Sequence, residues 1–200
     1  MRVVRALDLS ELPTYAYGAR SLLWWATLGF CAIEGTAFAL ALMAYVYLRL
    51  KASVWPPSVP PPALIWGTLN TGLLLGSCVP NFLAKKAAER EEIRPVRIWL
   101  SVCLLFGVAF CGVRALEFTA LRTSWNADAY GSIVFALLFL HTTHIVTDVG
   151  DTAVLTALIF TRHGRGRRFV DVSENAFYWY FVVLAWLPIY VMVYIVPRVW

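Results

Sequence analysis

The chain has 200 residues, of which 60% are apolar and only 14% are charged. A soluble domain of this length does not need so large an apolar fraction, so the composition argues against a soluble globular protein. The 17 basic residues exceed the 12 acidic ones, but they lie in clusters between apolar segments, which is not the pattern of a nucleic-acid-binding surface. We therefore expect a membrane protein with no nucleic-acid partner.

Five apolar segments are each long enough, as helices, to cross a hydrocarbon core of about 30 Å. They cover residues 22–48, 63–83, 96–121, 130–160 and 177–196. The sequence therefore predicts an all-α membrane protein, a bundle of five transmembrane helices. The segment 1–21 has two acidic residues, a proline and no apolar run, which is not the pattern of a signal peptide. We expect it to be a cytoplasmic N-terminal segment that precedes one transmembrane domain over residues 22–200.

Basic residues are distributed unequally between the two ends of these segments. Twelve of the 17 lie on the side of the N-terminus, four lie on the opposite side, and Arg114 lies inside the third segment. Because the cytoplasmic side of a membrane protein carries the excess of Lys and Arg, this asymmetry predicts a cytoplasmic N-terminus and a periplasmic C-terminus. The expected location is the bacterial inner (plasma) membrane.

Four ionisable residues form a stripe on the fourth segment: His141, His144, Asp148 and Asp151, spaced by three, four and three residues. Such groups are costly in a bilayer unless paired, so they are expected to face protein and to mark function. Glu34 and His141 both lie near the midplane, about 18 and 17 Å from the ends of their helices. We expect Glu34 to be protonated, paired or hydrogen-bonded to His141 or His144, which makes a buried polar network.

Other polar and aromatic residues have structural interpretations. Arg114 and Glu117 are three residues apart on the third segment and are expected to form a structural ion pair. Trp55 follows the first segment in a proline-rich connection and is expected to anchor the chain at the outer membrane interface. The four cysteines all lie within apolar segments and are expected to be buried fillers.

The histidines argue against a metal or haem site in this chain. Only three are present, His163 lies outside the apolar segments, and there is no Glu-x-x-His motif of the kind that di-iron proteins use. His141 and His144 share one helix face and could not bind opposite sides of one haem. A proton-coupled transporter remains an alternative, because Glu, His and Asp near the midplane suit a proton relay.

Short motifs in a fixed order cover the chain from about residue 22 to its end. They are Glu34 with Phe38, Trp55-Pro56-Pro57, Leu69-Asn70-Thr71, Glu117-Phe118, Tyr130-Gly131-Ser132, His141-x-x-His144, and Glu174 ahead of Tyr178-Trp179 and Trp186. In this order and spacing they resemble subunit III of haem-copper oxidases, the cytochrome c oxidase subunit III family. The resemblance is to the short five-helix form, which lacks the two N-terminal helices of longer members.

The resemblance implies a non-catalytic subunit that holds no haem or copper and packs on the haem-bearing subunit I, with subunit II as a further partner. It would support oxygen reduction coupled to proton pumping and bind phospholipid between its helices. Haem and copper would lie in the partner subunits, so the chain would belong to an oxidoreductase complex without a redox centre of its own. Glu34 resembles the family's buried glutamate, and His141 and His144 resemble its paired histidines.

The chain departs from the family pattern at five positions. Tyr180 and Val183 stand where members commonly have His and Asp. Thr142 and Asp148 stand where they have Gly, and Asp151 is also unusual. Asp148 and Asp151 are therefore candidates for a subunit interface or for proton uptake. An accessory subunit of a nitric oxide reductase or another divergent oxidase would share every motif matched, so it stays an alternative, and the electron donor and haem types stay open.

Overall fold

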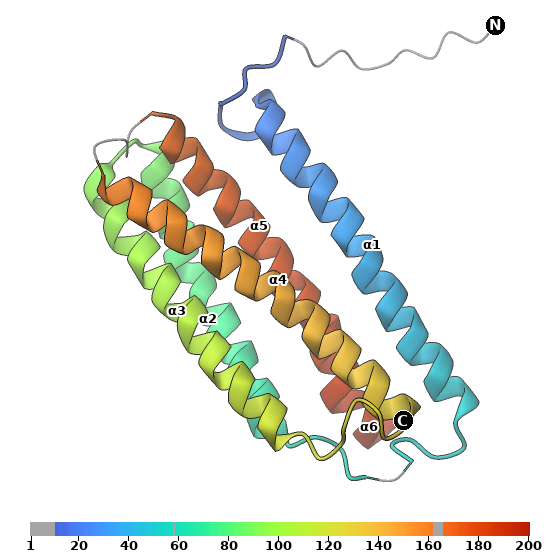
Figure 1. Ribbon diagram of the computed structural model, residues 1–200. Coiled ribbons are helices and arrows are strands. Elements are labelled where there is room, and N and C mark those ends of the chain that lie inside the picture. Colours follow the sequence, from blue (N-terminus) through green and yellow to red (C-terminus); the bar gives the residue numbers. More distant parts are fainter. Residues whose placement is uncertain (1–10, 58, 162–165) are drawn as a thin grey trace, which may run out of the picture.

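The computed structural model describes residues 11–57, 59–161 and 166–200, and its five long elements are helices that run side by side (Figure 1). A short 3-10 turn, Gly18–Arg20, leads into α1 (Leu22–Lys51). The chain continues through α2 (Leu64–Glu89), α3 (Ile93–Ala120), α4 (Ala129–Phe160) and α5 (Arg167–Tyr190). A π-helical turn, Val191–Ile195, then connects α5 to the terminal turn α6 (Val196–Val199). The predicted all-α architecture with five long helices is confirmed.

Four of the five helices are long and apolar enough to cross a membrane within the described ranges: α1, α3, α4, and α5 with its extension. Of the five predicted transmembrane helices, all five are present as long helices, and four of them qualify as membrane spans while α2 is less apolar. This helix carries polar side chains that bond to α5. Thr71 accepts the indole N–H of Trp186 at 2.8 Å, and Ser77 accepts that of Trp179 at 2.8 Å. Such residues lower the hydropathy of α2, but their polar atoms are satisfied inside the bundle.

Two helices extend beyond the apolar segments that predicted them. α5 begins at Arg167, ten residues before the predicted segment, and α2 continues to Glu89. The first turns of α5 hold an ion pair between Arg168 and Asp171, at 2.8 Å. Hydropathy detects the part of a helix that suits hydrocarbon, whereas the helix itself continues into the polar headgroup region.

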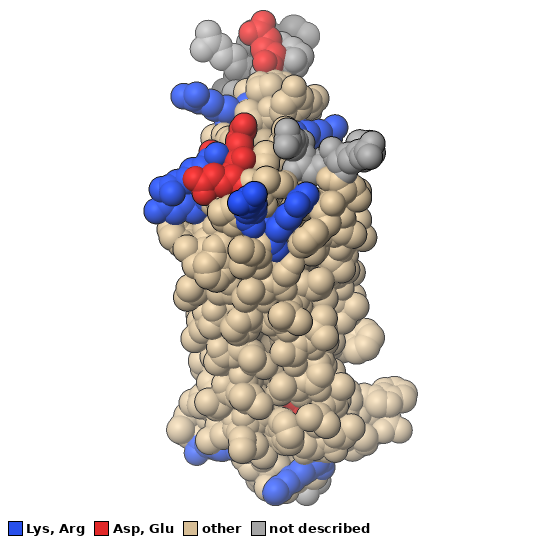
Figure 2. Space-filling model, turned by 90° about the vertical axis from the view of Figure 1, so that its left-hand side faces the viewer, with Lys and Arg blue, Asp and Glu red and all other residues tan. Residues whose placement is uncertain are grey.

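The helices pack in a defined order. α2 packs on α3 and α5, α4 packs on α3 and α5, and α1 packs on α4 and α5 at one side of the bundle (Figure 1). One buried cluster surrounds Trp186, and a second surrounds Leu100 in the half that holds the α2–α3 connection. Figure 2 shows charged side chains gathered at both ends of the visible face, with a nearly uncharged band between them. This is the surface expected of a protein that crosses a bilayer.

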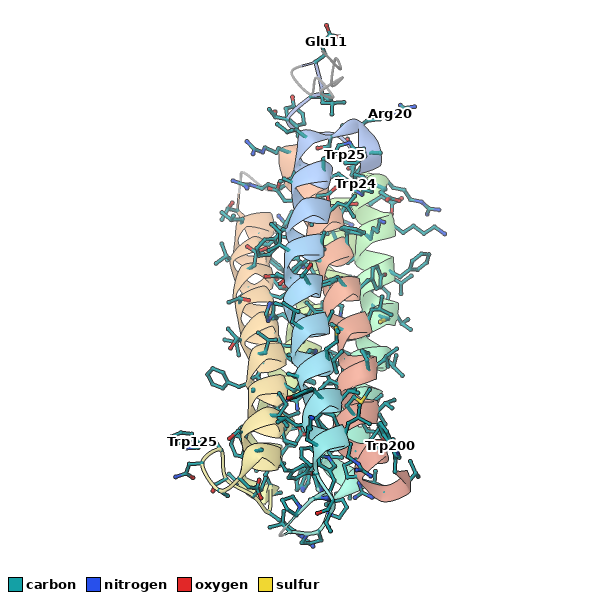
Figure 3. All side chains as sticks on the ribbon, turned by 90° about the vertical axis from the view of Figure 1, so that its right-hand side faces the viewer. Glu11, Arg20, Trp24, Trp25, Trp125 and Trp200 are labelled. Atoms are coloured by element: carbon teal, nitrogen blue, oxygen red, sulfur yellow. The ribbon has the colours of Figure 1, made fainter. Side chains whose placement is uncertain are left out.

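Tryptophan side chains lie at both ends of the bundle. Trp24 and Trp25 are at one end and Trp125 and Trp200 at the other (Figure 3), as in the aromatic belts of membrane proteins. Trp55, expected at the interface, is instead only 8% exposed. Its indole N–H donates to the Tyr45 hydroxyl at 2.9 Å, because the proline-rich connection places the ring against the ends of α1 and α4. The interface prediction for Trp55 is therefore wrong.

Tyr17 holds the segment before α1 against the end of α2. Its hydroxyl donates to the carbonyl of Ala88 at 2.7 Å. Burial, with Glu91 and Glu89 nearby, raises the pKa of Tyr17 to about 12, above the usual value of about 10. Only the protonated hydroxyl can donate, so the stabilisation is complete below pH 10 and is lost as the pH rises through 12. In an absorbance titration of tyrosinate, Tyr17→Phe should reduce the change near pH 12 by one group; a reduction near pH 10 instead would contradict this contact.

Candidate functional site

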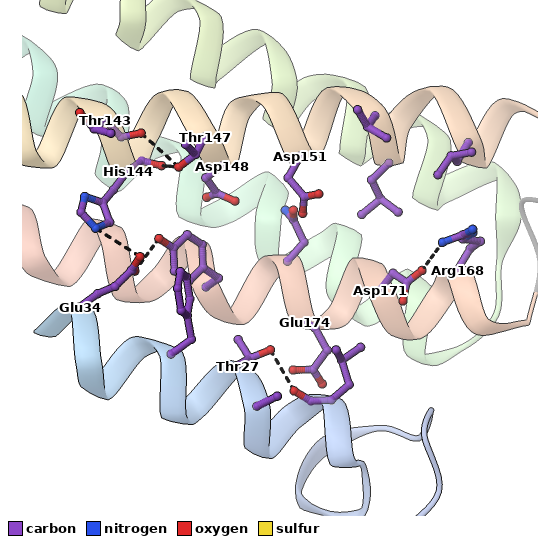
Figure 4. A pocket seen from close by; sticks show the side chains of 18 residues that line it. Thr27, Glu34, Thr143, His144, Thr147, Asp148, Asp151, Arg168, Asp171 and Glu174 are labelled. Atoms are coloured by element: carbon purple, nitrogen blue, oxygen red, sulfur yellow. Dashed lines mark hydrogen bonds and ion pairs between the residues drawn. The ribbon is translucent and has the colours of Figure 1, made fainter.

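A pocket of about 930 Å³ opens between α1 on one side and α4 and α5 on the other (Figure 4). We call it the interhelical pocket. Its volume is within the range of ligand sites in proteins. Much of its lining is apolar, but it also includes eight ionisable residues: Glu34, His144, Asp148, Asp151, Arg168, Asp171, Glu174 and Tyr178.

Glu34 joins α1 to both neighbouring helices. Its Oε1 lies 3.3 Å from Nε2 of His144 on α4. Its Oε2 accepts a hydrogen bond from the Tyr178 hydroxyl on α5 at 2.7 Å. The Phe38 ring, one turn along α1, lies 4.8 Å from the His144 ring between centroids. One carboxylate therefore ties together the three helices that surround the pocket.

The hydrogen bonds of His144 fix how many protons this contact holds. Nδ1 lies 2.6 Å from the backbone carbonyl of Leu140, and because a carbonyl can only accept, Nδ1 must carry a proton. Nε2 then either donates to the Glu34 carboxylate as an imidazolium or accepts from a protonated Glu34. In both arrangements the pair has no net charge. This neutrality suits a contact near the middle of a bilayer.

His141 lies apart from this contact. Its side chain is fully buried, and Nε2 is 3.2 Å from the carbonyl of Val182 on α5. The ring packs against Trp186, with centroids 5.0 Å apart. The structure thus brings Glu34 and His144 together and places His141 on the other edge of the stripe. The physical reason is that the stripe spans an arc of about 80°, which is wide enough to face two different neighbours.

A second polar cluster is buried between α2, α3 and the π-helical turn. Arg114 and Glu117, predicted as a pair, lie 2.7 Å apart, and each side chain is 1% exposed. Glu117 also accepts hydrogen bonds from Asn70 and from Tyr194. The Arg114 guanidinium stacks over the Trp186 ring at 4.3 Å, a cation–π contact that helps to replace lost water.

Gly67 on α2 provides a test of this cluster. A Cβ at this position would lie 2.6 Å from the Tyr194 ring, whose hydroxyl bonds to Glu117. Because Tyr194 is fully buried, we expect Gly67→Ala to destabilise the protein by about 1–3 kcal/mol through overpacking. Gly72→Ala on the same helix is the matched control, since nothing lies within 4 Å of its Cβ. Thermal unfolding of both variants checks this; equal stability would show that Tyr194 is free to move.

Asp148 and Asp151 both line the interhelical pocket from α4 (Figure 4). Asp148 is only 3% exposed, and its Oδ2 has no hydrogen-bond partner in the described part of the chain. Asp151, one turn nearer the end of α4, is exposed at the pocket. Over the described ranges, no three His, Cys, Asp or Glu side chains are arranged to hold a metal ion; His163 lies outside those ranges.

Sequence reasoning missed several partners of these residues. Tyr178 was part of a family motif, but its bond to Glu34 was not foreseen. Asn70 and Tyr194 were not foreseen as partners of Glu117. Asn70 is near the start of α2 and Glu117 near the end of α3, so both lie at the same level of the membrane. A comparison of membrane depth, as was made for Glu34 and His141, could have identified Asn70 as a partner of Glu117.

Comparisons with known proteins show a similarity that covers most of the chain. The sequence model of the family "Cytochrome c oxidase subunit III" matches residues 18–198. Cytochrome c oxidase subunit 3 of Thermostichus vulcanus is 24% identical over 168 residues, which is 82% of this chain and 83% of that protein. The subunit 3 of Alkalihalophilus pseudofirmus is 26% identical over 173 residues, with 81% of both chains covered.

A longer relative is matched over a smaller share of its length. Cytochrome c oxidase subunit 3 of the kangaroo Osphranter robustus is 28% identical over 144 residues, which is 70% of this chain but 54% of that protein. The chain therefore spans most of the length of the two bacterial relatives and about half of this one. Because the family match covers residues 18–198, nearly the whole chain, this multi-pass membrane protein belongs to the cytochrome c oxidase subunit III family.

Proposed function

We propose that the chain is the non-catalytic subunit III of a respiratory haem-copper oxidase in a bacterial inner membrane. It packs on the haem-bearing subunit I, with subunit II in the same complex, and supports oxygen reduction coupled to proton pumping. The observation that carries the proposal is the family match over residues 18–198. The haem and copper belong to the partner subunits, and phospholipid fills spaces between the helices.

The two polar clusters have different roles in this proposal. Arg114 and Glu117 are structural, because they are sealed inside the bundle at 1% exposure. Glu34 and His144 lie on a pocket that opens at the surface of the bundle, so they can exchange protons with water or with a partner. Asp148 and Asp151 extend this polar surface toward the cytoplasmic side, where the positive-inside rule puts the N-terminus.

The proposal is tested by removing this chain from the complex. The remaining oxidase should keep its haem absorption spectrum, because the chain supplies no haem ligand. Its oxygen consumption should begin at a similar rate but decline faster during turnover, since proton uptake is less well supported. Altered haem spectra on removal of the chain would contradict the proposed role, as would unchanged turnover stability.

Assays on the intact complex and on the isolated chain distinguish the other candidate functions. A complex that consumes nitric oxide but not oxygen would identify a reductase accessory subunit. Proton-coupled solute uptake by the purified chain in liposomes, abolished by Glu34→Gln, would identify a transporter. We expect oxygen consumption by the complex and no uptake by the isolated chain.

A further inference from the structure

Asp148 and Asp151 are acidic groups in the membrane without a basic partner in the described part of the chain. The other charged groups of the interhelical pocket are already engaged: His144 with Glu34 at 3.3 Å, and Arg168 with Asp171 at 2.8 Å. Glu174 has Lys85 of α2 in electrostatic range. The groups that act electrostatically on Asp148 are themselves acidic, Asp151 and Glu34. Asp148 and Asp151 therefore have no cationic neighbour to pair with among the described residues.

We propose that the interhelical pocket receives a transmembrane helix of a partner subunit, and that a Lys or Arg of this helix pairs with Asp148 and Asp151. The inference rests on the proposed function in one respect, which is that the chain works inside a complex. Charge complementarity carries it. Asp148 lines the pocket, is only 3% exposed, and has an Oδ2 without a hydrogen-bond partner in the described part of the chain. Ionisable groups at membrane depth normally pair with one another.

Depth decides what kind of cation can reach the two carboxylates. Asp148 and Asp151 lie 12 and 9 residues before the end of α4 at Phe160, or about 18 and 14 Å along the helix. α4 has 32 residues, so it exceeds a 30 Å hydrocarbon core by about 9 Å at each end. Both carboxylates then lie about 5–9 Å below the headgroups. The amine of a lipid headgroup would have to move out of the headgroup region to reach these carboxylates. A basic side chain on a transmembrane helix can extend to their depth.

The apolar surface beside the pocket and the distribution of basic residues in the chain also favour a partner helix. α1 packs on α4 and α5 at one side of the bundle, and the surface around the pocket is apolar, with Val154 60% exposed. A second copy of this chain could not supply the cation, because Arg114 is the only basic residue well inside its apolar segments and is itself buried against Glu117. The partner is therefore a different protein.

A photo-reactive amino acid placed at Val154 tests the proposal in membranes of the native host. After illumination, mass spectrometry should identify a cross-linked transmembrane segment of another protein that carries Lys or Arg within its apolar run. The same probe at Leu105 on α3, which is 68% exposed and does not line the pocket, should not capture that segment. Cross-links only to lipid, or to a segment without an intramembrane basic residue, would overturn the proposal.

The charge contribution is measured by Asp148→Asn with Asp151→Asn, which preserves side-chain shape. We expect the yield of the cross-link at Val154 to fall at least fivefold. The control Thr147→Val changes the same lining without removing charge and should leave the yield within twofold. An unchanged yield in the double Asn variant would overturn the proposed pairing even if a helix is present.

Failure of the pairing and failure of the proposed function can be distinguished. If the chain co-purifies with a haem-bearing subunit but Val154 captures no basic helix, only the pairing fails. If Val154 captures a basic helix and no haem-bearing subunit co-purifies, the pairing stands and the oxidase role fails.

Discussion

Replacing Glu117 by Gln is expected to lower the free energy of unfolding by about 3–5 kcal/mol, the usual cost of breaking one partner from a buried ion pair. Arg114 would keep its charge, at 1% exposure, without a carboxylate to compensate it. Gln retains an oxygen that can accept from Tyr194. Its amide nitrogen cannot accept from Arg114 and Asn70 as Oε2 does, so the change removes the charge together with these two hydrogen bonds. Denaturant unfolding in mild detergent, followed by tryptophan fluorescence, measures the difference.

The control for this prediction removes both charges. In the double variant Arg114→Met with Glu117→Leu, no uncompensated charge remains, so the protein should be more stable than the Glu117→Gln variant. Tyr194 and Asn70 lose their acceptor in the double variant, which keeps it below the wild type. If the double variant is as unstable as the single one, the energetic importance of the cluster lies in its hydrogen bonds and not in the charge of Arg114.

Replacing Glu34 by Leu is expected to loosen α1 from the bundle, at a cost of about 2–5 kcal/mol. The change leaves the Tyr178 hydroxyl and the His144 Nε2 without a partner, and each unsatisfied buried group costs about 1–3 kcal/mol. Gln should be tolerated much better than Leu, because its amide can donate to Nε2 of His144 and accept from Tyr178. The neutral charge of the Glu34–His144 pair makes this isosteric replacement possible.

The position of α1 can be followed by the distance between spin labels at two exposed sites, Ile33 on α1 and Leu105 on α3. Glu34→Leu should broaden and lengthen this distance distribution, while Leu40→Ala, at a site 62% exposed, should not. A narrow, unchanged distribution in Glu34→Leu would show that apolar packing alone holds α1 in place.

The sequence was most informative about properties that are measured along the helix axis, such as length and depth. The length of each apolar segment predicts a helix, and the matching depths of Glu34 and His141 predict that Glu34 can meet His141 or His144. Rotation about each helix axis is a different matter. It decides that His144 faces Glu34 while His141, three residues away, faces Val182 on α5. No pattern within one helix specifies which neighbour lies at each side, because that depends on how the bundle packs.

Polar helices and connections were the least predictable parts. α2 carries Thr71 and Ser77 because these side chains accept indole N–H groups from α5, a reason that hydropathy cannot detect. Trp55 has the residue type and the sequence position of an interface anchor. Its indole N–H nevertheless donates to the buried hydroxyl of Tyr45. In both examples a hydrogen bond to a residue of a neighbouring helix decides the position of the side chain, and the hydropathy of the local sequence does not show this bond.

Association with a haem-bearing subunit is the central claim, and purification of the tagged chain from native membranes in mild detergent tests it most directly. We expect a large subunit with haem absorption bands to elute with this chain in a fixed ratio, and we expect the complex to consume oxygen. Elution of the chain alone, with no haem absorption under conditions that keep other membrane complexes intact, would contradict the account.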